Sequence, residues 1–142
     1  MQPWVEELRR HRIEAMAIDL PHGRAERAVD TYRKAVAGYP NSVIGGHSFG
    51  GRVASMLASE QEVPGLVLLS YPLHRPGHPE ELRIDHWPAV KCPVLLLSGE
   101  SDQFATIGLL RYPGVGHGLI PVIEDASARM ATFIESIPPV RI

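Results

Sequence analysis

Short apolar runs alternate with longer segments of helical spacing, and this alternation limits the fold more than any other feature of the chain. The runs are nearly continuous rather than alternating, as expected for strands that are buried on both faces of a sheet. Strands that alternate with helices form a parallel sheet covered on both sides. The pattern therefore predicts an α/β fold with strands at residues 13–19, 42–46, 65–70 and 93–98.

Helices are predicted where apolar residues recur at intervals of three and four between these runs. The first predicted helix opens with a proline, which suits the first helical turn. Residues 71–88 are rich in proline, glycine and histidine and too long for an ordinary turn, so we expect a loop that forms a cap or lines a cleft. The predicted helices cover residues 3–11, 24–37, 51–59 and 122–137, and a last short strand covers 110–112.

The composition indicates a single globular domain over residues 1–142. A net charge of −2 offers no basic surface for nucleic acid. No apolar run approaches the roughly 20 residues that cross a membrane, and the acidic N-terminus does not fit a signal peptide. The single cysteine, Cys92, excludes an internal disulfide and favours a reducing, cytoplasmic compartment. It opens an apolar run, and we interpret it as a buried structural thiol.

The strongest chemical signal is G-x-S-x-G at residues 46–50, with Ser48 at its centre. A predicted buried strand precedes it and an amphipathic helix follows, which is the context of a nucleophile elbow. The helix N-terminus would favour a developing oxyanion, and the N–H of Phe49 would be one donor to it. The alternative is a serine in a glycine-rich turn whose hydroxyl only caps the helix.

A serine nucleophile needs a base, and the base needs a partner that orients it. In folds with such an elbow the chain order is serine, acid, histidine. Asp102 follows the strand at 93–98, and His117 is the only histidine after it. Glu100 competes for the role of acid, Asp102 could be a turn residue, and His117 could be an exposed loop histidine.

Three further side chains are candidates for lining a substrate cleft: His47, Tyr71 and His74. His47 stands beside the nucleophile, where we expect it to pack or to form a hydrogen bond within the elbow. No arrangement of histidine, cysteine and carboxylate suggests a metal, and no phosphate- or dinucleotide-binding motif is present, so no cofactor is expected.

The residues around the elbow, 45–52, resemble those of dienelactone-hydrolase-like α/β hydrolases. The segments 68–74, 92–94 and 99–102 are similar to the same group, which includes testis-expressed hydrolase-like proteins. The resemblance implies a three-layer α/β-hydrolase fold, a triad of Ser48, Asp102 and His117, and no cofactor. Substrates within this family are poorly defined, and some of its animal members are components of larger complexes, so the resemblance indicates the fold more firmly than any particular activity.

The chain departs from this family in two places. Similar proteins have a strand and a loop like His-Gly-Ala-Gly-Gly before the Pro3-Trp4 helix, so we expect an N-terminally truncated fold. That strand would lie between those predicted at 13–19 and 42–46, and without it the two either pair directly or leave an edge for a second chain. Asp102 and His117 are only 15 positions apart, which puts in doubt whether His117 reaches Ser48.

These features predict a serine hydrolase that cleaves a small carboxylic ester, lactone or thioester. The expected partner is a small-molecule ester-type substrate, with no nucleic acid and no membrane. The alternatives are an incomplete fragment, or a binding or assembly module that keeps the elbow for structural reasons, such as a homo-oligomer that completes the sheet edge.

Overall fold

The computed structural model describes residues 1–99, 111–112 and 117–138. In chain order it contains the helices α1 (Gln2–Arg10) and α2 (Ala25–Val36), the strand β1 (Ile44–His47), the helix α3 (Phe49–Glu60), the strands β2 (Leu66–Leu69), β3 (Val94–Gly99) and β4 (Arg111–Tyr112), and the helix α4 (Ile123–Ser136). Short 3-10 turns cover Trp87–Ala89 and Ile120–Val122. All four predicted helices are therefore present, and their ends differ from the prediction by one or two residues.

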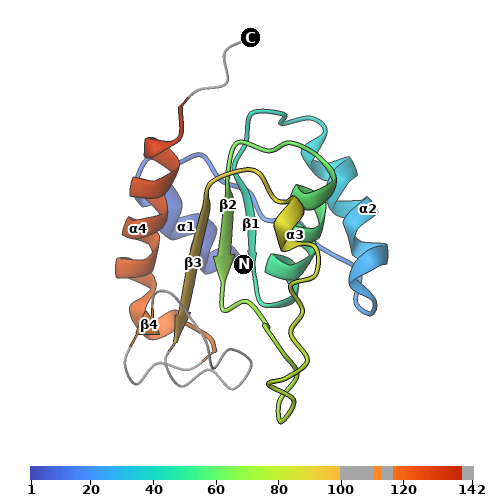
Figure 1. Ribbon diagram of the computed structural model, residues 1–142. Helices are drawn as coiled ribbons and strands as arrows, with labels where there is room; N and C mark the ends of the chain where they lie inside the picture. The colour runs from blue at the N-terminus through green and yellow to red at the C-terminus, as the bar shows by residue number, and fades with distance from the viewer. Residues whose placement is uncertain (100–110, 113–116, 139–142) are drawn as a thin grey trace.

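The strands form one parallel sheet in the order β1-β2-β3-β4. Ile44 lies beside Leu66, and Leu66 lies beside Val94, so the first three strands start level. Their carboxyl ends therefore meet at one edge of the sheet (Figure 1), which is the edge where parallel α/β sheets bind ligands.

Helices cover both faces of the sheet, as the continuous apolar runs predict. Helices α1 and α4 lie on one side, and α2 and α3 lie on the other (Figure 1). Successive residues of β2 point to opposite faces: Leu66 and Leu68 pack with α2 and α3, whereas Val67 and Leu69 pack with α1 and α4. The protein thus has the predicted three-layer α/β/α architecture.

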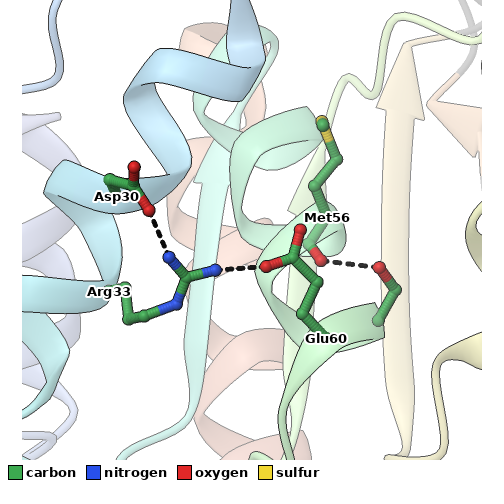
Figure 2. A network of polar contacts seen from close by, with 5 residues as sticks. Asp30, Arg33, Met56 and Glu60 are labelled. Carbon is green, nitrogen blue, oxygen red and sulfur yellow. Dashed lines mark hydrogen bonds and ion pairs between the residues drawn. The ribbon is translucent and has the colours of Figure 1, made fainter.

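Helix α2 shows how the spacing of apolar residues becomes packing. Ala25, Ala28, Val29 and Tyr32 are all buried, and they share one face because they recur at intervals of three and four. Beside this face stands Arg33, which pairs with Asp30 of its own helix and with Glu60 of α3 (Figure 2). These ion pairs are exposed and contribute little stability, so the buried face holds the helix in place.

The predicted strand at residues 13–19 does not form. In the described part of the structure these residues belong to no strand or helix and run as irregular coil after α1. A strand needs hydrogen bonds from a neighbour, and the outer edge of β1 is occupied at Gly45 by a side chain instead. The Tyr32 hydroxyl donates to the Gly45 carbonyl at 2.7 Å and accepts from the Gly45 N–H at 3.0 Å. The two predicted strands therefore do not pair directly.

The long loop predicted at 71–88 replaces the helix that usually connects parallel strands. It turns back at the isolated bridge between Arg75 and His78 and ends in the turn Trp87–Ala89. It is held against α3 by the Ser55 hydroxyl, which lies 2.7 Å from Nε2 of His86. The Tyr71 and Trp87 rings meet edge to face at 5.1 Å within the loop, and its 3-10 turn packs against α3.

Within the described part of the chain, no helix combines the length and apolar character needed to cross a membrane. Cys92 is a free thiol that is partly rather than fully buried, so it is more exposed than the sequence led us to expect. The partial burial nevertheless raises the pKa of the Cys92 thiol, which keeps it in the unreactive protonated form.

Candidate active site

Ser48 joins β1 to α3 in a sharp turn. Its φ of +52° and ψ of −117° are rare for a residue with a side chain. The Ser48 N–H donates to the Leu69 carbonyl at 2.8 Å, which continues the sheet ladder, and the Ser48 carbonyl accepts the first helical bond from Arg52 at 3.1 Å. One residue thus ends the strand and begins the helix, and such strained positions are typical of functional sites.

The glycines around Ser48 have unequal roles. A Cβ on Gly46 would lie 2.3 Å from the carbonyl carbon of Gly50, and a Cβ on Gly51 would lie 2.8 Å from the Gly46 carbonyl oxygen. A Cβ on Gly50 would meet nothing within 4 Å. Strand and helix therefore approach closely through Gly46 and Gly51. The motif correctly includes Gly46, but Gly51, which lies outside it, is the second glycine that the turn requires.

The Ser48 hydroxyl does not cap α3. Its Oγ lies 2.8 Å from Nε2 of His117, although 69 positions separate the two residues in sequence. At that distance the imidazole can accept the hydroxyl proton. The alternative of a mere helix cap thus has no hydrogen bond to support it, and the short spacing before His117 does not keep it from Ser48.

The main chain of His117 is held by the strand ends beside it. Its carbonyl oxygen lies 2.6 Å from Oγ of Ser70 and 2.8 Å from Nε2 of His47. His47 is the last residue of β1, and Ser70 follows β2 directly. His47 thus forms a hydrogen bond, but its partner is His117 rather than a residue of the elbow. Ser70 was not singled out by sequence, because a serine at a strand end carries no motif.

Asp102 and its competitor Glu100 lie outside the described residues. The role of either as the partner of the His117 ring therefore stays a prediction. The N–H of Phe49 is the first of α3, where the free N–H groups of a helix point outward. It lies at the same turn that presents the Ser48 hydroxyl.

Tyr71 and His74 are buried, with exposed fractions of 0% and 2%. The Tyr71 hydroxyl donates to the Arg83 carbonyl at 2.8 Å, and burial raises its pKa. His74 uses Nδ1 for a contact of 2.8 Å with the Arg75 carbonyl. Their burial gives the cleft interpretation no support, whereas His47 does line a groove.

That groove has a volume of about 360 Å³ and lies between the outer edge of β1 and the coil segment after α1. Gly45, Gly46 and His47 form one wall, and Phe49 and Gly50 of the elbow also line it, whereas Ser48 and His117 are not among its described lining residues. No Asp, Glu, Lys or Arg side chain is among its described lining residues. The remaining lining is mainly apolar: Met1, Met16, Ala17, Ile18, Leu20, His22, Gly23 and Tyr32.

One group among the described residues has metal-ligand spacing, formed by His78, Glu80 and Glu81. All three are exposed, and Glu81 already pairs with Arg75 at 2.7 Å. The guanidinium of Arg75 lowers the pKa of the Glu81 carboxyl. The group lies at the turn of the crossover loop, where Glu81 and Arg75 form an ion pair on the surface.

Comparisons with known proteins identify the family and the fold of this chain. Residues 12–126 match the family described as the alpha/beta hydrolase domain. The monoacylglycerol lipase of Paleococcus ferrophilus superposes with a TM-score of 0.73 at 14% identity, over 96% of this chain and 88% of that chain. A protein of Pectobacterium atrosepticum described as a YdeN-like hydrolase gives 0.69 at 19% identity, over 96% and 84%. At these identities the two structures show the fold alone.

Proposed function

Because the chain belongs to the alpha/beta hydrolase domain family, we propose that it is a serine hydrolase with Ser48 as nucleophile and His117 as general base. The Ser48 Oγ attacks the carbonyl carbon of an ester while its proton passes to Nε2 of His117. The Phe49 N–H donates to the oxyanion that forms. His117 then returns the proton to the leaving alkoxide, and water hydrolyses the acyl-enzyme by the same steps.

The observation that carries this proposal is the distance of 2.8 Å between Ser48 Oγ and His117 Nε2. The strained backbone at Ser48 adds to it, because the turn holds the hydroxyl clear of the helix that it would otherwise cap. A serine with a purely structural role would need neither feature.

The groove beside the elbow favours a small, uncharged acyl group. Its volume of about 360 Å³ is at the lower end of the range of small-molecule sites, about 300–1,000 Å³. Its described lining holds no Asp, Glu, Lys or Arg side chain and is mainly apolar apart from His22, His47 and Tyr32, so an uncharged acyl group suits it better than a charged one, whose hydration the groove would replace only in part. A carboxylic ester, lactone or thioester of modest size is the substrate class that these features support.

The experiment that tests the proposal combines a fluorophosphonate probe with a series of p-nitrophenyl esters. We expect the purified protein to be labelled and to turn over short acyl chains better than long ones. Ser48→Ala should abolish labelling and lower kcat by up to about 10⁶-fold. Ser59→Ala is the matched control, because its hydroxyl only donates to the Met56 carbonyl on α3. A folded wild-type protein that neither reacts nor turns over would contradict the proposal.

We further propose Asp102 as the acid that accepts the hydrogen bond from Nδ1–H of His117. Asp102→Asn should lower kcat by about 10⁴-fold, because the amide selects the wrong imidazole tautomer. Glu100→Gln should leave kcat nearly unchanged. The reverse ranking of the two variants in a steady-state assay would assign the role to Glu100.

A second candidate function is that of an assembly module, favoured by the outer edge of β1. Among the described residues no strand pairs with this edge, and Met16 beside it is half exposed. Outside Gly45, whose backbone groups Tyr32 takes, such an edge accepts a further strand, for example one from a second copy of this chain. Light scattering would then detect an oligomer. A monomer whose esterase activity depends on Ser48 would contradict it.

A further inference from the structure

We propose that Ser70 and His47 are positioning residues, which hold His117 at the distance from Ser48 that proton transfer requires. The inference rests on the proposed hydrolase function and assigns roles to two side chains that do not touch the reacting atoms. Both act on the main chain of His117 rather than on its reactive nitrogen.

The geometry that carries the inference is a double anchor on one carbonyl oxygen. The His117 carbonyl accepts from the Ser70 hydroxyl at 2.6 Å and from the His47 ring at 2.8 Å. Two donors on one oxygen fix both its place and its direction. The main chain of His117 is thereby held in one position beside the strand ends. From that position its Nε2 lies 2.8 Å from the Ser48 hydroxyl.

Ser70 occupies a position where a serine is costly. Its φ is +49°, a conformation that glycine adopts without strain and other residues seldom adopt. The residue is fully buried, and its N–H donates to the Leu97 carbonyl at 2.7 Å, so the sheet fixes its backbone. Glycine would adopt this backbone conformation without strain, but it has no hydroxyl. Because the Ser70 hydroxyl donates to the His117 carbonyl, this hydrogen bond explains why a serine occupies the position.

His47 contributes a second, directional contact. For Nε2 of His47 to donate to a carbonyl oxygen it must carry the proton, which fixes the tautomer of a neutral ring. The His47 and His117 rings also meet edge to face, with centroids 5.1 Å apart and planes at 61°. His47, the residue before the nucleophile, thus restricts both the position of the His117 carbonyl and the orientation of the His117 ring.

The consequence for the proposed reaction concerns orientation. A misplacement of about 1 Å between a catalytic group and its partner can cost about 10²-fold in rate. The two anchoring side chains lie at the ends of two adjacent strands, where the sheet fixes the backbone. They act before the substrate binds, so their loss should lower kcat and leave KM nearly unchanged.

The test compares Ser70→Gly with Ser70→Ala. Both remove the hydroxyl, but only the glycine variant also relieves the backbone strain. We expect both to lose about 10²-fold in kcat with little change in KM, while Ser70→Gly unfolds at a higher urea concentration than Ser70→Ala. Ser59→Ala, which loses a serine–carbonyl bond of the same length, 2.6 Å, should keep wild-type kcat. Wild-type kcat in Ser70→Gly would overturn the role of Ser70.

For His47 the informative pair is His47→Gln and His47→Phe. The glutamine amide offers an N–H donor near the position of Nε2 and should retain much of kcat. The phenylalanine ring keeps the edge contact but cannot donate, and should lose about 10²-fold in kcat. Equal rates in the two variants would overturn the role of the hydrogen bond.

Imidazole ¹⁵N NMR separates this inference from the proposed function, because it needs no turnover. Ser48→Ala defines the Nε2 resonance of His117 without its contact to the hydroxyl. We expect Ser70→Gly and His47→Phe to shift that resonance toward the Ser48→Ala position, and Ser59→Ala to leave it in place. A wild-type protein that shows these shifts but has no activity would contradict the proposed hydrolase function and still support the positioning roles of Ser70 and His47. An unmoved resonance would refute the anchors.

Discussion

At the scale of single residues, the site depends on backbone positions that ordinary side chains avoid. Ser48 and Ser70 both have positive φ, at +52° and +49°, and each stands directly after the paired residues of a strand. The two hydroxyls are presented to opposite parts of the same residue, the ring and the carbonyl of His117. Strain at these strand ends is offset by the packed sheet below them.

The glycines of the turn provide a prediction at this scale. Gly46→Ala should destabilise the protein by about 3 kcal/mol, because its Cβ would overlap the backbone of α3 at 2.3 Å. Gly50→Ala should stabilise it by up to about 1 kcal/mol, because the new methyl group meets open space and alanine favours the helix. Urea unfolding of the two variants measures both effects. Equal losses would show that the motif glycines are equivalent.

At the scale of elements, β1 is the least conventional strand. It pairs with β2 on one side, and on the other the Tyr32 hydroxyl takes both the N–H and the carbonyl of Gly45. A side chain from α2 thus forms, at this one residue, the two backbone hydrogen bonds that a neighbouring strand would otherwise provide. Burial raises the pKa of the Tyr32 hydroxyl. The hydroxyl therefore stays protonated and can donate its hydrogen bond to the Gly45 carbonyl.

Tyr32→Phe should therefore destabilise the protein by about 1–3 kcal/mol, since it leaves two backbone groups of β1 without this partner. Tyr39→Phe is the control, because Tyr39 is 52% exposed. Urea unfolding compares the two variants. A Tyr32→Phe protein as stable as Tyr39→Phe would show that water replaces the hydroxyl at no cost.

At the scale of the whole molecule, the crossover loop couples stability to pH. Burial lowers the pKa of His86 below its usual value of 6.5, and the cation of Arg52 lowers it further, against a smaller opposite effect of Asp85. The unfolded chain therefore binds a proton at a higher pH than the folded chain does. His86 contributes stability above about pH 6.5, and this contribution is lost as the pH falls below that value.

His86→Gln should reduce the pH dependence of the free energy of unfolding between pH 7 and pH 5. The amide can still contact the Ser55 hydroxyl, which His86 reaches at 2.7 Å, but it does not titrate. Urea titrations at several pH values, compared with His22→Gln at an exposed position, measure the difference. An identical slope in all three proteins would contradict the assignment.

The sequence by itself determined the layers and the nucleophile turn, because both depend on local patterns. Continuous apolar runs predict strands buried on two faces, and β2 shows this with Leu66 and Val67 on opposite sides. The G-x-S-x-G motif between a strand and a helix predicts the elbow, and of its two glycines Gly46 is the one that the close approach of strand and helix requires. The family resemblance was correct for the α/β-hydrolase fold, and its narrower placement among dienelactone-hydrolase-like proteins stays a prediction.

Only the tertiary structure decided which distant groups meet. Residues 13–19 have the composition of a strand, but a strand also needs a neighbour, and Tyr32 takes the edge of β1 at Gly45 instead. Ser70 has no motif, and its contact with His117 arises because parallel strands end at the same edge. Composition and spacing act along the chain, whereas hydrogen bonds between strand ends depend on the packing of the whole sheet.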